Sequence, residues 1–551
     1  MPLKGLRRRW SAWRTARNHD ALRRAAQATI GAYHDRPGWS FEPVGGAYVV
    51  ARQVEAVQPW LFSERLAQRI HGVLDGLGVE SWAVQPLRSR ITLWSVREDD
   101  FVRAVDAVRQ ELAGEGFYLR PLGGRRIRLA EDSLPQGIDG VRGVDIFRYV
   151  RDSTGRVTSD YERCLLVRWV RSDRDTLTTE VREAVVQEIE DQAPVPVVEV
   201  RRWDGSTQPR PAVLAVPDVS EIDFEIDAVY MWVSSADPAW QERQRAAFRR
   251  LHLQDPTVDE AAQSAVRYRD RGELRASMRS LEMYAPWIRR IFLVTDDQHP
   301  EWLDLNSDRV TVVDHREIFS DPSVLPCFNS RAIGSQLHRI PGLAEHYLVV
   351  NDDVMFNRAV SPYDFFTPEG FMKIVLSRSR LARLDPEKLT ALERSRTNSA
   401  GLIKATHGAT PTRVFAHIPL TQSKQIAQEI SQLYAAEVGQ TIQHQFRSPL
   451  DYETNAWLHQ YRAMFTHRAI VTQTPYVYTS PTEGKPRELM DTGEAFADAL
   501  FVCVNDNVAP DEKADDQWLA SWLSRFYPVP AAFELADGVS GENTGRLGQP
   551  D

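Results

Sequence analysis

Two adjacent carboxylates follow a strongly apolar segment near the middle of the second half of the chain. The apolar run Tyr347–Val350 predicts a buried strand. Asp352 and Asp353 stand just beyond its end, after Asn351. In open α/β sheets the carboxyl ends of the strands face the ligand crevice, and Mg²⁺ binds through one or two carboxylates together with substrate phosphates. The pair therefore indicates a metal site for nucleotide-sugar or phosphoryl chemistry, although a solvated acidic turn has the same local pattern.

Two other residues could take part in the same chemistry. Asp506 stands after the predicted strand Phe501–Val504, which would deliver it to a sheet edge, with a polar turn as the alternative. His417 precedes Pro419 in a predicted loop or strand end. Its imidazole titrates near neutrality and suits acid–base work on a hydroxyl, but an isolated histidine is more often structural.

The segments that carry these residues predict an α/β fold with a Rossmann-like, nucleotide-sugar-binding sheet. Apolar runs that alternate with helical stretches are typical of a parallel sheet. Beyond residue 220 the predicted strands are 226–233, 291–295, 310–313 and 347–350, with a helix over 271–284. We expect a helical insertion around residues 380–445. Residues 25–220 predict an α/β accessory domain, and a proline-rich stretch marks its boundary near 205–222.

Composition limits the class of protein. At 551 residues the chain predicts two or three domains. Its net charge of −9 disfavours a nucleic-acid partner. The three widely spaced cysteines exclude a disulfide framework and suit a reducing cytosol. The sequence shows neither an apolar run long enough to span a bilayer nor the apolar core of a signal peptide, so we expect a cytoplasmic protein.

Both ends of the chain differ in composition from the rest. Residues 1–24 are strongly basic, and Leu6, Trp10 and Trp13 would share one face of a helix. Such a helix can contact an anionic membrane surface peripherally, although a solvated terminal helix has the same composition. Residues 536–551 are predicted to be disordered because they hold few bulky apolar side chains.

Several motifs in the second half of the chain are specific. They include Tyr268-Arg269-Asp270, Phe328-Asn329-Ser330 and Leu337-His338-Arg339-Ile340-Pro341. Together with the acidic pair they resemble the Stealth family of sugar-phosphate transferases, which includes bacterial capsule polymerases. The four matching regions lie at about 226–240, 267–366, 398–450 and 501–535, within a transferase domain of residues 221–535. Arg331 and Ala236 depart from the family pattern, which leaves the fine donor or acceptor preference open.

The resemblance implies a reaction and its partners. A Stealth protein transfers a hexose-1-phosphate from a nucleotide diphosphate sugar to a glycan hydroxyl, and it releases a nucleoside monophosphate. The product would be a phosphodiester-linked exopolysaccharide or capsule. One alternative is a metal-dependent glycosyltransferase, which would release a nucleoside diphosphate. The other is a non-catalytic glycan-binding protein.

The resemblance also implies roles for particular residues. The catalytic set would be Asp353, His417 and Arg447, with Arg447 binding phosphate oxygens in a bidentate manner. Asp352, Asp353 and Asp506 would hold Mg²⁺ or Mn²⁺. The candidates for substrate binding are Trp232, Asp237, Arg275, Asn329, Ser330 and His338. Two of these have open alternatives, since Trp232 could stack on a base or pack in the core, and Arg275 could reach phosphate or form surface ion pairs.

Overall fold

A computed structural model describes most of the chain. The described residues are 33, 36–45, 47–55, 57–84, 91–123, 127–132, 137–202, 206–215, 219–254, 268–382, 385–479, 487–488, 490–491, 493, 496–505 and 513–536. The basic segment 1–24 and nearly all of the segment 536–551 lie outside these residues, and so does Asp506. The chain divides into two compact units, residues 1–220 and 221–551.

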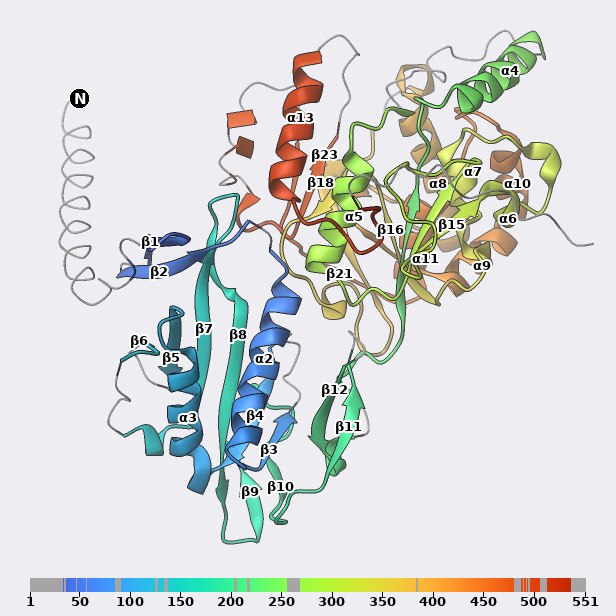
Figure 1. The fold of residues 1–551 in the computed structure, drawn as a ribbon. Helices are drawn as coiled ribbons and strands as arrows, with labels where there is room; N and C mark the ends of the chain where they lie inside the picture. Colours follow the sequence, from blue (N-terminus) through green and yellow to red (C-terminus); the bar gives the residue numbers. More distant parts are fainter. Residues whose placement is uncertain are drawn as a thin grey trace, which may run out of the picture. The chain divides into compact units, whose positions relative to one another are not determined.

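The first unit is built on a large mixed sheet with helices packed on it (Figure 1). Its strands are β1 (Trp39–Val44), β2 (Ala47–Gln53), β3 (Ser81–Val84), β4 (Leu93–Arg97), β5 (Phe117–Pro121), β6 (Arg128–Leu129), β7 (Gly143–Arg151), β8 (Val157–Arg171), β9 (Thr176–Thr178) and β10 (Glu188–Glu190). The helices α2 (Pro59–Gly76) and α3 (Glu98–Leu112) bury their apolar faces in one core. A separate hairpin consists of β11 (Val197–Arg201) and β12 (Thr207–Pro211).

The second unit contains the sheet that the apolar runs predict. Its strands are β13 (Ile226–Met231), β14 (Ile291–Thr295), β15 (Val310–Asp314), β16 (His346–Val350) and β20 (Leu420–Ser423). They lie in the order β15-β14-β13-β16-β20, in which the first four are parallel and β20 is antiparallel to β16. The predicted α/β class with a Rossmann-like sheet is confirmed. Because β13, β14 and β16 are largely buried on both faces, they read as nearly continuous apolar runs in the sequence, whereas the edge strand β15 is partly exposed.

Two smaller sheets lie beyond the parallel sheet in the chain. One contains β17 (Val354–Phe356), β22 (Tyr476–Thr479) and β23 (Phe501–Val504), and the other contains β18 (Met372–Arg380), β19 (Arg413–Phe415) and β21 (Ala469–Thr472). The register of β17 with β23 places Val354 opposite Cys503. Since Val354 follows the acidic pair directly, this pairing brings the end of β23 to the end of β16.

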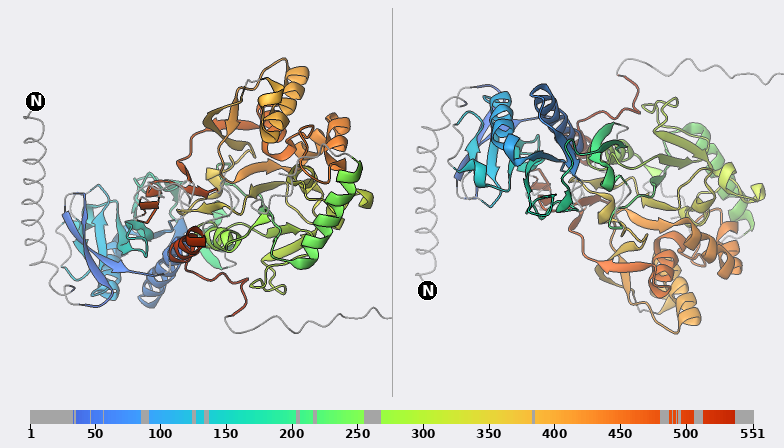
Figure 2. Two further views of the ribbon diagram at one scale, coloured as in Figure 1. Left: turned by 90° about the horizontal axis from the view of Figure 1, so that it is seen from above. Right: turned by 90° about the horizontal axis from the view of Figure 1, so that it is seen from below.

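Helices surround these sheets (Figures 1 and 2). They are α4 (Pro238–Gln254), α5 (Glu273–Tyr284), α6 (His315–Ile318), α7 (Ser330–Gly334), α8 (Ala391–His407), α9 (Lys424–Leu433), α10 (Ala435–Gln443), α11 (His459–Phe465) and α13 (Lys513–Phe526). The expected insertion around 380–445 is mainly helical, but it also supplies β19 and the edge strand β20. Thr390 and Glu393 begin α8 with a capping box, and Gly408 ends it in the left-handed conformation. No helix within the described ranges is both long and apolar enough to cross a membrane.

Candidate functional site

Asp353 lies at the centre of a polar cluster at the carboxyl end of β16. Its Oδ1 lies 3.2 Å from Nε2 of His417, and its Oδ2 accepts a hydrogen bond of 2.7 Å from the Asn505 amide. The Sγ atom of Cys503 lies 3.5 Å from the same Oδ2. The backbone N–H of Val504 also donates to the carbonyl oxygen of Asp353 at 2.9 Å. The antiparallel pairing of β17 with β23 therefore joins segments that are about 150 residues apart in the sequence.

His417 reaches this cluster from the segment that follows β19. The N–H of Ala416 donates to the carbonyl of Val375 in β18 at 2.9 Å, which fixes the backbone next to the histidine. The Nδ2 atom of Asn351 lies 3.0 Å from the same imidazole Nε2 that faces Asp353. Burial lowers the pKa of His417, but the hydrogen bond and charge of Asp353 outweigh it and hold this pKa above its usual value. The pair is arranged so that the imidazole can accept and hold a proton.

Asp352 lies in a buried, acidic environment that disfavours its ionised form. Burial raises the pKa of Asp352, and repulsion from Asp353, Glu273 and Asp270 raises it further. Its carboxylate accepts a hydrogen bond from the backbone N–H of Asp353, and it forms no ion pair within the described residues. Burial also raises the pKa of Asp353, but hydrogen bonds led by that of His417 outweigh it and lower this pKa. Two carboxylates that share a site in this way are stabilised by a cation between them.

The donor atoms present fit a divalent cation. The carboxylate oxygens of Asp352 and Asp353 are hard ligands of the kind that Mg²⁺ and Mn²⁺ prefer. The donor atoms of Asp353, His417 and Cys503 also lie within 4.8 Å of one another. Burial raises the pKa of the Cys503 thiol well above its ordinary value, which disfavours the thiolate form that binds metals. The oxygen donors are therefore the better-suited set.

Arg447 belongs to a second group, at the amino end of α7. Its Nη2 donates to Oγ of Ser330 at 2.7 Å. Asn329 is completely buried and caps α7, because its Oδ1 accepts from the N–H of Arg331 at 3.1 Å. The Nδ2 atom of Asn329 donates to Asp451 at 3.0 Å and to the His444 carbonyl at 3.2 Å. Asn329 thus holds the loop that carries Arg447, and its polar atoms are engaged within the protein.

The remaining candidates for substrate binding have internal partners. Trp232 is 7% exposed and donates from Nε1 to Asp270 at 2.8 Å. Asp237 accepts from the Gln298 amide at 2.9 Å, and this hydrogen bond lowers its pKa. Arg275 donates from Nε to the buried carboxylate of Glu534 at 2.6 Å, so it joins α5 to the segment after α13. These contacts favour the core and ion-pair alternatives for Trp232 and Arg275.

His338 is buried close to the core beneath the parallel sheet. Only 7% of it is exposed, and burial lowers its pKa to about 4. The imidazole is therefore neutral at physiological pH, which fits a packing role.

Sequence reasoning left two of the cluster's members without a role. Asn351 directly precedes the acidic pair, so its position in the sequence indicates that it lies near the site. No sequence pattern indicates a role for Cys503, because it resembles an ordinary buried residue of the strand before Asn505. Asp506 lies outside the described residues, but its neighbour Asn505 contacts Asp353 directly.

Comparison with known proteins agrees with this geometry. Three family models match the chain, namely Stealth protein conserved region 2 over residues 267–374, conserved region 3 over 416–464 and conserved region 4 over 498–543. An exopolysaccharide phosphotransferase of Streptomyces coelicolor is 32% identical over 496 residues, which cover 87% of this chain and 83% of that protein. The chain belongs to the Stealth family.

Two further comparisons concern a second relative and a solved structure. A second exopolysaccharide phosphotransferase of Streptomyces coelicolor is 34% identical to the Stealth protein described here, over 95% of this chain and 90% of that protein. Among solved structures, the galactosyltransferase LgtC with donor and acceptor sugar analogues has a TM-score of 0.28 at 10% identity, over 55% of this chain and 95% of that one. The resemblance read from the motifs is confirmed, and this Stealth protein is a transferase enzyme that acts in sugar phosphotransfer.

A buried polar network supports the Arg447 loop of the Stealth protein. Its hub is Asp451, whose side chain is 0% exposed and lies 3.1 Å from Arg331 Nη1. The other Asp451 oxygen lies 2.7 Å from Nδ1 of His444, and the N–H of Ser448 donates to Asp451 at 2.9 Å. Arg331 also lies 3.4 Å from Glu453. The network fixes the backbone on both sides of Arg447.

Asp451→Ala should lower the free energy of unfolding by about 3–5 kcal/mol, because it leaves buried donors without their acceptor. Urea titration followed by circular dichroism measures the change. Asp385→Ala is the control. Both side chains of the Asp385–Lys388 ion pair are exposed, so this substitution should change the free energy of unfolding by less than about 0.5 kcal/mol. Equal effects of the two substitutions would show that Asp451 is not a structural hub.

Proposed function

We propose that this enzyme transfers a hexose-1-phosphate from a nucleotide diphosphate sugar to a glycan hydroxyl. The oxygen of the acceptor hydroxyl attacks the phosphorus nearest the sugar, and a new O–P bond forms. The bond from that phosphorus to the bridging oxygen breaks, and the nucleoside monophosphate leaves with that oxygen. The product is a phosphodiester-linked exopolysaccharide or capsule. The observation that carries this proposal is the 3.2 Å contact between Asp353 and His417, next to Asp352 at the carboxyl edge of the sheet.

Residues of the cluster and of the Arg447 group have roles in the proposed step. His417 accepts the proton of the attacking hydroxyl, and Asp353 orients the imidazole and stabilises its charged form. Asn351, whose Nδ2 lies 3.0 Å from Nε2 of the imidazole, is proposed to help to position the ring. Arg447, with Ser330, is proposed to bind the phosphate oxygens in a bidentate manner as charge develops on them. Phosphoryl transfer depends mainly on such positioning and charge stabilisation.

We also propose that Asp352 and Asp353, with Asp506, hold Mg²⁺ or Mn²⁺. Bound there, the ion would supply Lewis-acid stabilisation of the diphosphate. The closeness of Asp352 to the carboxylates of Asp353, Glu273 and Asp270 supports this assignment, because a bound cation would offset their mutual repulsion.

The identity of the released nucleotide tests the proposed reaction. A panel of nucleotide diphosphate sugars is incubated with the enzyme, Mg²⁺ or Mn²⁺ and a glycan acceptor, and the nucleotides are separated by ion-exchange chromatography. We expect nucleoside monophosphate in equal amount to the sugar transferred, and a phosphodiester signal in the ³¹P NMR spectrum of the product. Stoichiometric nucleoside diphosphate with a phosphate-free product would identify a glycosyltransferase instead.

The place of action is a further part of the proposal. We propose that the enzyme works at the cytoplasmic face of the membrane, where cytosolic donors and a growing surface polysaccharide meet. The support is the basic segment 1–24 with Trp10 and Trp13, because each lysine or arginine near anionic lipid contributes about 1 kcal/mol.

Deletion of residues 1–24 should reduce co-sedimentation with phosphatidylserine vesicles at low salt. Vesicles of phosphatidylcholine alone serve as the control, and raised salt should weaken binding of the full-length protein because it screens the charges. If the full-length protein stays in the supernatant with anionic vesicles at low salt, the segment is a solvated terminus only.

A further inference from the structure

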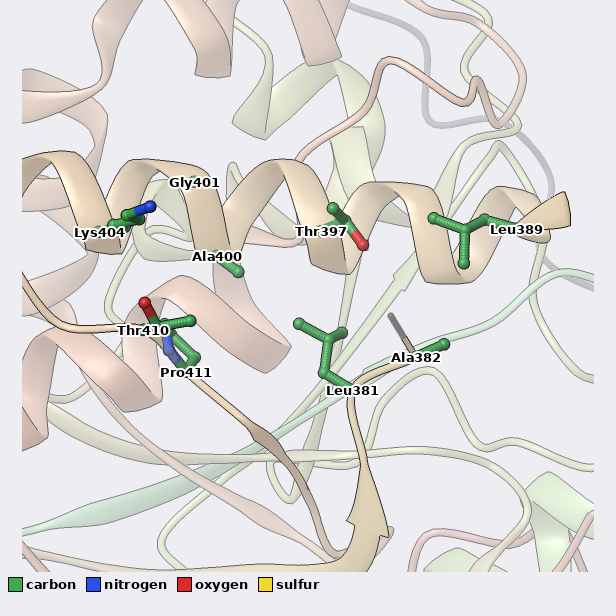
Figure 3. Close-up of a pocket in the computed structure, with 9 residues that line it drawn as sticks. All are labelled: Leu381, Ala382, Leu389, Thr397, Ala400, Gly401, Lys404, Thr410 and Pro411. Atoms are coloured by element: carbon green, nitrogen blue, oxygen red, sulfur yellow. The ribbon is translucent and has the colours of Figure 1, made fainter. Parts of the chain in front are cut away.

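A cavity of about 200 Å³ lies between α8 and the ends of β18 and β19. Figure 3 shows Thr397, Ala400, Gly401 and Lys404 along α8, facing Leu381, Thr410 and Pro411. The lining is mostly apolar or small. Gly401 is exposed, and an added Cβ there would meet no atom within 4 Å.

The strands that border the cavity lead to the candidate catalytic histidine. In β18, Val375 accepts the backbone hydrogen bond of Ala416, the residue next to His417. From Val375 the same strand runs to Arg380, and Leu381 of the cavity follows it. At a rise of about 3.3 Å per residue, the cavity lies roughly 20 Å along the strand from His417. A chain-like acceptor whose end lies at His417 could therefore extend along β18 to the cavity.

The path between the two places is positively charged. Arg378 and Arg380 are exposed and two residues apart in β18, so their side chains project from the same face. Lys404 is exposed at the cavity itself. None of the three forms an ion pair with a carboxylate among the residues that the structure describes. The stretches 376–382 and 404–413 contain no aspartate or glutamate.

We propose that β18, β19 and this cavity bind the already built, phosphodiester-linked part of the acceptor. The inference rests on the proposed function, which makes a chain with one negative charge in each phosphodiester. Arg378, Arg380 and Lys404 are complementary to those charges, and the small apolar residues of α8 offer a surface to the faces of the sugar rings. At physiological salt the screening length is about 8 Å, so each cation acts mainly on the phosphodiester next to it.

The consequence is a preference for long acceptors. The ratio of kcat/KM for an oligomer of several repeats to kcat/KM for a single repeat should exceed one in the wild-type enzyme. In the double variant Arg378→Ser, Arg380→Ser this ratio should fall by roughly three- to tenfold, because two charge contacts are lost. High salt should lower the wild-type ratio in the same direction.

A matched control and a steric variant complete the experiment. Arg290 and Arg339 are also exposed arginines without an ion pair in the described residues, but they precede β14 and β16 and so lie at the opposite edge of the sheet. The double variant Arg290→Ser, Arg339→Ser should keep the wild-type ratio. Gly401→Phe should lower the ratio by filling the cavity without a backbone clash.

The outcomes separate this inference from the proposed function. The released nucleotide is identified in every assay. Two outcomes with monophosphate release overturn the acceptor path alone. In the first, the wild-type enzyme has equal kcat/KM for the oligomer and the single repeat. In the second, the double variant Arg378→Ser, Arg380→Ser keeps the wild-type ratio. Diphosphate release overturns the proposed function, and the acceptor path with it.

Discussion

Asp353→Asn should lower kcat by about 10³-fold or more. The substitution keeps the size of the side chain but removes the negative charge that faces His417 and that is proposed to help hold the cation. Loss of several kcal/mol of transition-state stabilisation corresponds to this factor, since each 1.36 kcal/mol is tenfold in rate. The measurement is the steady-state rate of nucleotide release at saturating donor, with metal-dependent donor binding measured separately by calorimetry.

Asp308→Asn is the matched control for this prediction. Asp308 is exposed and precedes β15, so it lies at the edge of the sheet opposite the cluster. We expect wild-type activity for this variant and similar melting temperatures for both proteins. If Asp353→Asn retained activity within a few-fold of wild type at limiting metal, Asp353 would not belong to the reacting site.

His417→Ala should lower kcat by about 10²–10⁴-fold and change the donor KM only slightly. General acid–base help acts in the transition state, so its loss reduces the rate rather than the affinity for the ground-state donor. The change is measured from initial rates over a range of donor concentrations at saturating acceptor.

His417→Gln separates proton transfer from hydrogen bonding. A glutamine amide can still donate to Asp353, but it cannot accept the proton of the attacking hydroxyl. A loss as large as that of His417→Ala supports the role of general base. Near-normal kcat in the glutamine variant, or a change in donor KM alone, would make His417 a binding residue.

The sequence alone determined the fold class and the family, and it predicted the centre of the proposed site. The inner strands of the parallel sheet are buried on both faces, so local apolar runs such as Tyr347–Val350 mark them directly. The acidic pair follows one of these runs, and the carboxyl end of a parallel strand is where ligands bind. The family motifs then linked His417 to that pair, and the structure places the two side chains 3.2 Å apart.

Only the tertiary structure decided which other side chains surround Asp353 and which are engaged elsewhere. The contacts of Cys503 and Asn505 depend on the register of two short strands that are far apart in the sequence, and no local pattern encodes such a register. Asn329 looked like a sugar ligand, but it is an N-cap whose amide is bonded to the loop that carries Arg447.

The sequence allows Arg275 either to contact phosphate or to form a surface ion pair. In the fold its partner is the buried carboxylate of Glu534. A polar residue's role depends on the partner that folding brings to it. Local sequence shows what a side chain can bind, whereas long-range packing decides which of those bonds it makes.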